Sequence, residues 1–176
     1  SSDLTEQKGQ DVLLRAYAEI HEVFPSWRLV LAGEGSQRET LEALAADLGL
    51  SEVAQFIGRT QQVESWYGRA AIVAQPSRFE GFPNALLEAM GMGAAVISTD
   101  CRSGPSELIK SEENGILVPV DNVAELAGAL RRLMSDPHRR AMLGNAALGA
   151  RQAFAAGPIY DQWARLLNAH SCDAQH

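Results

Sequence analysis

The chain has 176 residues, of which 46% are hydrophobic, and a formal net charge of −7 at pH 7. This is the size of one ordinary domain with enough apolar residues for a hydrophobic core. The acidic balance argues against broad nucleic-acid binding, no apolar run approaches the roughly 20 residues of a membrane-spanning helix, and the first residues lack the charged-then-apolar pattern of a signal peptide.

Short apolar runs alternate along the chain with segments of helical periodicity. The runs rich in branched residues predict buried strands, and the periodic segments predict helices. The predicted strands cover 27–32, 53–57, 71–75, 94–98 and 115–118, with a turn over 107–110. The predicted helices cover 10–24, 37–48, 61–69, 83–92, 123–134, 137–154 and 158–169. Residues 1–170 are expected to form one domain, and residues 171–176 a disordered tail.

Strands that alternate with helices predict βαβ units, and hence an α/β fold with a Rossmann-like parallel sheet and helices on both faces. Apolar runs without polar alternation fit strands that are covered on both sides. In such folds ligands bind beyond the carboxyl ends of the strands. The loops 33–36, 58–60 and 77–83 are all expected there. Their convergence predicts a single ligand crevice.

Residues 76–92, PSRFEGFPNALLEAMGM, carry the strongest functional signal. A strand leads here through a Gly-containing loop into an amphipathic helix that begins near Pro83. Such a helix start binds anions, because its first N–H groups lack intrahelical partners and the helix dipole favours negative charge. Glu80 in the loop and Glu88 in the helix, with seven residues between them, can accept hydrogen bonds from sugar hydroxyls. The combination predicts a ligand that is both a sugar and a phosphate ester.

Each of these residues also has a structural interpretation. Glu80 and Glu88 are either ligand contacts or acids favoured near a helix start by the dipole. Apolar neighbours flank Glu88, which predicts a carboxylate near an apolar face that needs a partner. Asn84 either contacts a ligand or supplies a hydrogen bond at the helix start. Lys8 is either a phosphate contact or a solvated residue, and Gly33 begins either a ligand loop or a plain tight turn.

Cysteines and histidines show no metal or catalytic pattern. Cys101 and Cys172 lie far apart without metal-ligand spacing, which predicts free thiols in a reducing cytoplasm. The histidines fall on predicted helices or in the tail; they are His21, His138, His170 and His176. An Asp-x-Asp metal motif is also absent from the sequence.

Five blocks, taken in order, resemble a known family: KGQDVLL, LVLAGEG, FIGRT, PSRFEGFPNALLEAMGMGAAVISTD and NGILVPVDN. They are similar to the C-terminal, donor-binding domain of retaining glycosyltransferases with the GT-B fold, in the large family four, or group 1. The resemblance covers residues 4–167. Its most specific part is the pair of glutamates with seven residues between them, within this order of blocks.

The resemblance implies roles for individual residues. Glu88 matches the glutamate that holds the ribose hydroxyls of the nucleotide, and Glu80 matches the one beside the 3- and 4-hydroxyls of the donor sugar. Lys8 matches the lysine that neutralises the diphosphate, so Glu80 and Lys8 are the expected catalytic residues. The expected binding residues are Gly81, Phe82, Pro83, Asn84 and Ala85 beside the sugar and diphosphate, Glu88, Arg59 beside the base, and Gly33. The implied ligand is a UDP- or GDP-sugar, without a cofactor or a tightly bound metal.

Two residues depart from the family pattern. An arginine usually stands five residues before the lysine, where this chain has Asp3. Either a second phosphate clamp comes from elsewhere, the register slips, or residue 3 lies beside an artificial end of the polypeptide. Pro83 stands where glycine is common, and proline has no N–H to donate, so one amide contact to the ligand is lost.

A GT-B enzyme also has an N-terminal acceptor domain, and its active site lies between the two domains. The resemblance therefore implies an excised donor domain that starts just past its first strand and whose partner is the acceptor domain of the same parent. The parent is expected in the cytoplasm, peripheral to the inner membrane face, with FPN favouring N-acetylhexosamines in polysaccharide or glycolipid synthesis. Two alternatives stay open: a non-catalytic nucleotide-binding or assembly module, and a nicotinamide-dependent oxidoreductase, for which the glycine fingerprint is incomplete.

Overall fold

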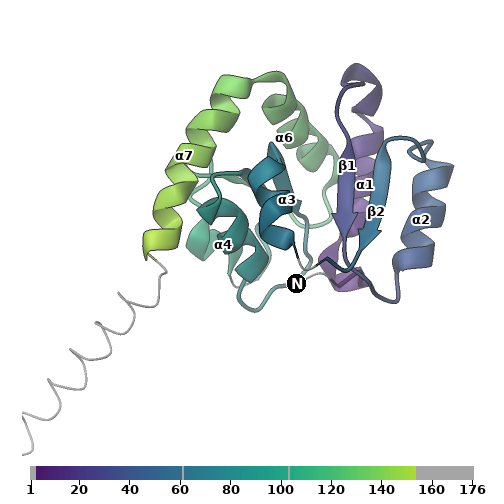
Figure 1. The fold of residues 1–176 in the computed structure, drawn as a ribbon, viewed down its shortest axis with the longest axis horizontal. Helices are drawn as coiled ribbons and strands as arrows, with labels where there is room; N and C mark the ends of the chain where they lie inside the picture. Colours follow the sequence, from purple (N-terminus) through teal and green to yellow (C-terminus); the bar gives the residue numbers. More distant parts are fainter. Residues whose placement is uncertain (1–2, 61, 103, 154–176) are drawn as a thin grey trace, which may run out of the picture.

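The protein is described here by a computed structural model over residues 3–60, 62–102 and 104–153. Strands and helices alternate along the chain, which confirms the predicted α/β class (Figure 1). The strands are β1 (Leu29–Ala32), β2 (Ala54–Gly58), β3 (Ile72–Gln75), β4 (Ala95–Thr99) and β5 (Ile116–Val118). The helices are α1 (Gln10–Ala18), α2 (Arg38–Asp47), α3 (Val63–Arg69), α4 (Asn84–Gly91), α5 (Pro105–Leu108), α6 (Val123–Ser135) and α7 (Pro137–Ala153), with 3₁₀ turns at Glu6–Lys8 and His21–Val23. The helix predicted over 158–169 and the tail predicted over 171–176 lie outside the described residues.

All strand pairs are parallel, as predicted, but they form two groups. β1 pairs with β2, while β3, β4 and β5 form a second sheet in that order. Within the described residues, β1 and β3 are therefore each unpaired along one edge. The parallel, Rossmann-like arrangement is confirmed, with an interruption between β1 and β3.

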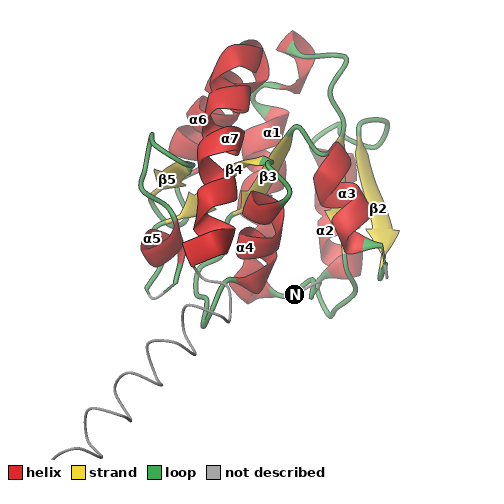
Figure 2. Ribbon diagram, turned by 60° about the vertical axis from the view of Figure 1, so that its left-hand side comes forward, coloured by secondary structure: helices red, strands yellow, loops and turns green. Residues whose placement is uncertain are grey.

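Helices cover both faces of the strands in two layers. One layer consists of α2, α1 and α6, and the other of α3, α4 and α7. Figure 2 shows the second layer in front of the strands and the first behind them. None of the helices in the described part of the chain is long and apolar enough to cross a lipid bilayer.

The core lies on both sides of β4, the most deeply buried strand. Ala95 and Ile97 point into the cluster shared with α1 and α6, and Val96 points into the cluster beneath α4 and α7. Every residue of β4 is buried, whereas β1 and β3 are mostly half-buried. Helices cover both faces of the sheets, as predicted, and the incomplete burial of β1 and β3 accompanies the missing strand neighbour along one edge of each.

The first helix is shorter than its periodicity predicts. It ends at Ala18 instead of continuing to residue 24. The fully buried Ile20 lies at the turn that follows, and the Tyr17 hydroxyl donates to the carbonyl of Trp27 at 3.0 Å. This bond holds the returning chain against the helix just before β1 begins.

Candidate functional site

The loops that follow the strands converge at one end of the molecule, as predicted. The Gly33 amide, after β1, donates to the carbonyl of Gly58, the last residue of β2, at 2.8 Å. The Arg78 amide, after β3, donates to the Gln7 carbonyl at 2.8 Å. The carboxyl ends of three strands and the N-terminal segment thus meet at the same edge.

A cavity of about 870 Å³ opens between the two groups of strands. Its inner part is apolar and lies between β1 and β3. Its outer part, at the carboxyl ends of the strands, is polar. The residues of this polar mouth are Lys8, Gln10, Gln75, Ser77, Glu80, Phe82, Pro83, Asn84 and Ala85.

Glu80 lies at the centre of the polar mouth and is only 5% exposed. The Lys8 ammonium donates to both of its carboxylate oxygens, at 2.8 and 3.0 Å. The Ser77 hydroxyl and the Gln75 amide donate to the Oε1 atom at 2.6 and 2.7 Å. The carboxylate is therefore held in one orientation by three side chains.

The surroundings of Glu80 keep it ionised. Burial by itself raises the pKa of this carboxyl, but the hydrogen bonds from Lys8, Ser77 and Gln75 and the charge of Lys8 together lower it below its ordinary value. A carboxylate and an ammonium are thus fixed side by side at the cavity mouth. Hydroxyl groups and an anion are the ligand groups that such a pair can bind.

Local sequence explains how Lys8 comes to lie beside the end of β3. The 3₁₀ turn Glu6–Lys8 ends at Gly9, whose φ of 66° is in the left-handed region. A Cβ atom at Gly9 would overlap the carbonyl of Pro76. Glycine therefore permits both the turn and the close approach that brings Lys8 to Glu80.

The exit of β3 is fixed from the other side by β4. The Ser98 hydroxyl donates to the Gln75 carbonyl at 3.1 Å, and the Thr99 hydroxyl donates to the carbonyl of Ser77. Both hydroxyls are buried. Two small polar residues at the end of an otherwise apolar strand thus hold the backbone that carries the donors to Glu80.

Some of the backbone amides at the start of α4 donate to carbonyls of the loop that precedes it. The amides of Leu86 and Leu87 donate to the Pro83 carbonyl, at 3.0 and 3.1 Å, and the Asn84 amide donates to the Phe82 carbonyl at 2.9 Å. The expectation of unpaired amides around Asn84 is therefore corrected. Among the described residues, the Ala85 amide has no backbone acceptor, so it is the N–H group at this helix start that a ligand could engage.

The loop before α4 rests on the loop after β4. Gly104 has a φ of 100°, and a Cβ atom there would lie 2.7 Å from Pro83 Cδ and 3.0 Å from the Gly81 carbonyl oxygen. Only glycine accommodates this conformation and this approach together. Gly104 thus sets the position of the proline that begins the candidate ligand loop.

Glu88 differs from its prediction. It is exposed and is not among the residues that line the cavity. Its apolar sequence neighbours turn inward while Glu88 turns outward, because successive helix residues do not share a face. Glu88 nevertheless lies near the cavity: burial and, secondly, its negative charge raise the pKa of the cavity-lining Tyr67 to about 12.

The cavity brings together only part of the predicted site. Lys8, Glu80, Phe82, Pro83, Asn84 and Ala85 line it, whereas Gly33, Arg59, Gly81 and Glu88 do not. Gly33 is buried and bonded to Gly58, and Arg59 is exposed. Arg78 is held by the carboxylates of Asp11 and Asp121, at 2.8 and 2.7 Å.

Sequence reasoning missed two glutamines. Gln10 and Gln75 line the polar mouth, and the Oε1 atom of each is buried without a hydrogen-bond partner in the described part of the chain. Each could accept a hydrogen bond from a ligand hydroxyl or amide. The signal for Gln75 was available, because a polar residue ends an apolar strand there. Over the described residues, His, Cys, Asp and Glu side chains do not gather in any group of three or more that could hold a metal ion.

Comparisons with known proteins show which family this chain resembles. The family model described as "Glycosyl transferases group 1" matches residues 1–149. An exopolysaccharide phosphotransferase of Streptomyces coelicolor is 35% identical over 93% of the chain, which covers 17% of that protein. A diphospho-undecaprenol 4-alpha-N-acetylgalactosaminyltransferase of Campylobacter jejuni is 33% identical over 86% of the chain, which covers 40% of that protein. The chain spans less than half the length of these relatives.

Solved structures match the fold closely. The C-terminal domain of a group 1 glycosyl transferase, LpcC, of Francisella tularensis has a TM-score of 0.79 and 29% identity, over 86% of this chain and 82% of that one. HepE of Anabaena, solved in complex with UDP, has a TM-score of 0.87 and 26% identity, over 95% of this chain and 47% of that one.

Proposed function

The chain belongs to the glycosyl transferases group 1 family and has the fold of the C-terminal domain of a GT-B enzyme, and we propose that it is the donor-binding domain of a retaining glycosyltransferase. The donor is a UDP- or GDP-sugar, and the parent enzyme passes its hexosyl group to an acceptor hydroxyl. The observation that carries the proposal is the ion pair between the half-buried Lys8 and the buried Glu80 at the mouth of the cavity.

The two charges of this pair suit different parts of the donor: the Glu80 carboxylate suits the sugar hydroxyls, and the Lys8 ammonium suits the diphosphate. An ammonium has three hydrogen-bond donors, and two of those on Lys8 point to Glu80. The third is available to a phosphate oxygen. The Glu80 carboxylate already accepts from Lys8, Ser77 and Gln75, so the 3- and 4-hydroxyls of the sugar would bind it in exchange for some of these bonds. Lys8 would therefore contact both the Glu80 carboxylate, which binds the sugar, and the diphosphate, which is the leaving group.

The start of α4 supplies the second contact to the diphosphate. The Ala85 amide and the positive end of the helix dipole lie at the polar mouth. Pro83 donates no N–H group, so Phe82 contributes shape and Asn84 a polar side chain at the mouth, while Gly81 lies in the same loop outside the cavity lining. No metal ion is needed in this scheme, because Lys8 and the helix start balance the charge of the diphosphate.

Glu88 and Arg59 lie outside the cavity lining and would bind the nucleoside portion. In the proposed complex the ribose lies against the exposed face of α4, where Glu88 accepts from its hydroxyls, while the base extends toward the loop of Gly33 and Arg59. HepE, whose structure contains UDP, shares this fold. The proposal of a uridine nucleotide rests on that likeness and on the open face beside Tyr67.

Catalysis by the parent enzyme would rest on position and charge. Glu80 fixes the sugar, while Lys8 and the helix start stabilise the negative charge that develops on the departing diphosphate. The acceptor site and the closure that excludes water belong to an N-terminal domain of the same parent. We therefore expect the isolated domain to bind nucleotide and to transfer almost no sugar.

The pathway proposal is surface polysaccharide or glycolipid synthesis in the cytoplasm, with the parent at the inner membrane face. The relative from Campylobacter jejuni is named for a lipid-diphosphate acceptor and an N-acetylgalactosaminyl group. FPN in the ligand loop fits the same donor class, N-acetylhexosamines.

Titration calorimetry with UDP, GDP and NAD tests the proposal. We expect UDP or GDP to bind in the micromolar to millimolar range and NAD not to bind. Lack of binding by UDP and GDP at millimolar concentration, with the fold intact by circular dichroism, would remove the proposed function. Binding of NAD alone would favour the oxidoreductase.

A second candidate is a non-catalytic nucleotide-binding module on the same scaffold. Asp3 favours it, because an acidic residue stands where the family has a phosphate-clamping arginine. Nucleotide binding together with a lack of sugar transfer by the full parent enzyme, assayed with its acceptor domain present, would establish this alternative.

A further inference from the structure

Arg78, in the loop after β3, connects three segments that lie far apart in the sequence. Its guanidinium donates to both carboxylate oxygens of Asp11, at the start of α1, at 2.9 and 2.8 Å. It also lies 2.7 Å from a carboxylate oxygen of Asp121, in the loop after β5, and donates to the Glu6 carbonyl at 2.6 Å. The donors of a guanidinium form a rigid planar fork, so these contacts fix the side chain in one orientation. We call Arg78 with Asp11 and Asp121 the Arg78 clamp.

The Arg78 clamp has the geometry in which partly exposed ion pairs contribute to structure, because it is bidentate at Asp11 and joins more than two charges. The guanidinium lowers the pKa of the Asp11 carboxyl, chiefly through its hydrogen bonds. Asp121 has a φ of 56°, in the left-handed region that residues other than glycine enter rarely. Backbone angles of this kind persist where surrounding contacts hold them, and the ion pair with Arg78 is such a contact.

Arg78 is also bonded to the 3₁₀ turn that ends at Lys8. Its side chain holds the Glu6 carbonyl, and its backbone amide donates to the Gln7 carbonyl at 2.8 Å. The Gln7 side chain donates in return to the Phe79 carbonyl at 2.9 Å. The two residues of the turn that precede Lys8 are therefore both tied to the loop after β3.

Among the described residues, this turn has few backbone hydrogen bonds of its own. The Lys8 amide donates to the Thr5 carbonyl at 3.0 Å, and the Gly9 amide donates to the Glu6 carbonyl at 3.3 Å. Short 3₁₀ turns have poorer hydrogen-bond geometry than α-helices, and lysine has a flexible four-carbon stem. Lys8 nevertheless donates to both carboxylate oxygens of Glu80. Its position therefore depends on the contacts that its neighbours in the turn make.

We propose that Arg78 is a positioning residue, which holds the turn Glu6–Lys8 so that the Lys8 ammonium faces Glu80 at the polar mouth. Arg78 does not line the cavity between the two groups of strands, so it acts on a ligand there only through Lys8. This inference rests on the proposed function in one respect: the Arg78 clamp keeps the third donor of Lys8 directed toward the diphosphate. Loss of the clamp then weakens the contact to the diphosphate and leaves the contacts to the nucleoside in place.

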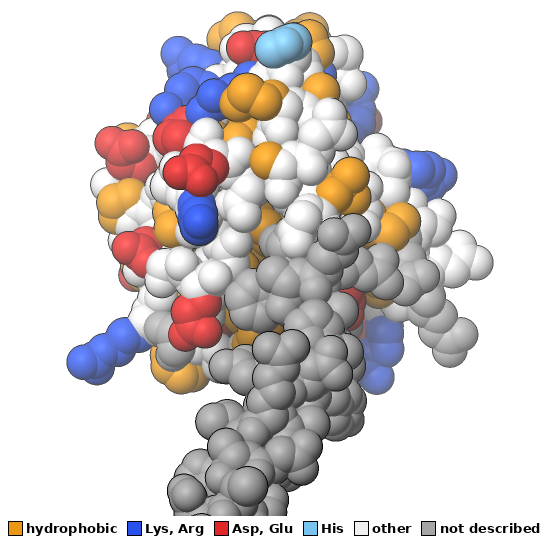
Figure 3. All heavy atoms as spheres, turned by 90° about the vertical axis from the view of Figure 1, so that its left-hand side faces the viewer, with side chains coloured by type: hydrophobic (Ala, Val, Ile, Leu, Met, Phe, Trp, Pro, Cys, Tyr) orange, Lys and Arg blue, Asp and Glu red, His pale blue; other side chains and the backbone are white. Residues whose placement is uncertain are grey.

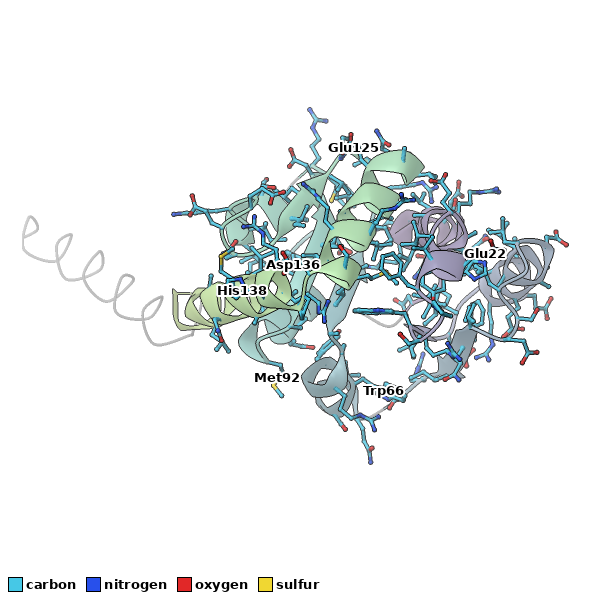
Figure 4. All side chains as sticks on the ribbon, turned by 90° about the horizontal axis from the view of Figure 1, so that it is seen from above. Glu22, Trp66, Met92, Glu125, Asp136 and His138 are labelled. Atoms are coloured by element: carbon cyan, nitrogen blue, oxygen red, sulfur yellow. The ribbon has the colours of Figure 1, made fainter. Side chains whose placement is uncertain are left out.

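Other charged groups in the described part of the chain are more open to water. Glu112 pairs with Arg132 and Arg139, and these three side chains are 47%, 58% and 32% exposed. Figure 3 shows the face that includes α7, where acidic and basic side chains lie interspersed on the open surface. Figure 4 looks from the end opposite the N-terminus and shows three acidic residues well apart from one another: Glu22, Glu125 and Asp136. Solvated charges of this kind contribute little to structure.

Chemical labelling of lysine tests the proposal without a nucleotide. The sequence has two lysines, Lys8 and the exposed Lys110, so Lys110 is an internal reference in the same sample. Acylation at neutral pH, followed by mass spectrometry, gives the ratio of their rates, and only the neutral amine reacts. We expect Arg78→Gln to raise the Lys8/Lys110 ratio about tenfold or more, because Lys8 leaves Glu80 more often. Loss of the Arg78 charge alone would favour the protonated ammonium and lower the ratio, so the sign of the change separates positioning from charge.

Two further variants control this measurement. Arg132→Gln removes an arginine from the exposed pair with Glu112 and should leave the ratio unchanged. Asp121→Asn removes one partner of Arg78 and keeps a residue that tolerates the left-handed φ, so a smaller rise is expected. The proposal is overturned by an unchanged ratio in Arg78→Gln with the fold intact by circular dichroism, or in Asp121→Asn where Arg78→Gln does not fold. An equal rise in Arg132→Gln would overturn it too.

Calorimetry with UDP and UMP tests the effect of the Arg78 clamp on ligand binding. UMP lacks the β-phosphate that Lys8 is expected to contact. Arg78→Gln should weaken UDP binding about tenfold, the scale of a hydrogen bond to a charged group, and leave UMP binding within about twofold. Equal weakening of both nucleotides would show a general effect on the fold and would overturn the positioning role. If the wild type binds neither nucleotide, the proposed function fails, while the labelling ratio still decides whether Arg78 positions Lys8.

Discussion

Replacing Glu80 by alanine should destabilise the protein mainly by leaving Lys8 without its partner. The Lys8 side chain is 15% exposed and the Glu80 side chain 6%, so both charges are largely removed from water. Breaking a buried ion pair by removing one partner costs about 3–5 kcal/mol. The flexible Lys8 stem can bring its ammonium back to solvent. We therefore expect the lower end of that range, about 3 kcal/mol.

Two matched variants separate the charge from the packing. Glu80→Gln keeps an oxygen that can accept from Lys8 and Ser77, so the expected loss is about 1–3 kcal/mol, the scale of a hydrogen bond to a charged group. The double variant Lys8→Met/Glu80→Leu removes both charges together. It should lie within about 1 kcal/mol of the wild type, because replacing a whole buried pair by apolar residues is often neutral.

Urea unfolding at neutral pH, followed by circular dichroism, measures all of these changes. The expected order of stability is wild type, close to the double variant, then Glu80→Gln, then Glu80→Ala. A loss below about 0.5 kcal/mol in Glu80→Ala, typical of a surface substitution, would show instead that the Lys8–Glu80 pair is solvated.

Acid titration gives the same pair an independent test. The pKa of Glu80 is lower in the folded protein than in the unfolded chain, since the bonds from Lys8, Ser77 and Gln75 outweigh the opposing effect of burial. The unfolded state therefore binds the proton more tightly, and the stabilisation from Glu80 is complete above the unfolded pKa. It is lost as the pH falls below about 4. The difference in free energy of unfolding between wild type and Glu80→Gln should therefore become smaller as the pH falls below about 4.

Three further predictions concern the surroundings of the site. Glu88→Ala should weaken UDP binding by about 1–3 kcal/mol, nearer the lower end because the residue is exposed; unchanged affinity by calorimetry would remove Glu88 from the site. Tyr67 should ionise at a pH of about 12. Glu88→Gln should lower this midpoint only slightly in an ultraviolet titration, since burial raises the Tyr67 pKa more than the charge of Glu88 does. A return to the ordinary tyrosine pKa in this variant would show that the charge is the larger cause. Gly104→Ala should cost about 1–3 kcal/mol because its φ is 100° and its Cβ would meet Pro83 at 2.7 Å, while Gly128→Ala, in open space on α6, should stabilise the protein by up to about 1 kcal/mol; equal effects in urea unfolding would contradict the strain at Gly104.

Local sequence patterns predicted most of the helices and strands and the edge of the fold at which the loops after the strands meet. α4 begins at Asn84, directly after the predicted start at Pro83. The loops after the strands meet at one edge, because parallel strands share the direction of their carboxyl ends. The start of α4 and the meeting of the loops could therefore be predicted from the sequence, because the first depends on local spacing and the second on strand direction.

The contacts within the site could not be inferred in the same way. Lys8 and Glu80 are separated by 72 residues, and only the close approach of Gly9 to Pro76 brings them together. Glu88 was expected near an apolar face, yet the helix rotates it outward. The sequence also did not predict that β1 and β3 each lack a strand neighbour along one edge. An apolar run has the same pattern whether the strand has one neighbour or two.

A crystal structure of the chain with bound UDP would locate the nucleotide relative to Lys8 and Glu88. We expect a β-phosphate oxygen within hydrogen-bonding distance of Lys8 Nζ at the polar mouth, and the ribose on the side of α4 that carries Glu88. UDP bound in the apolar inner part of the cavity, between β1 and β3, or on a surface away from Lys8, would contradict this placement.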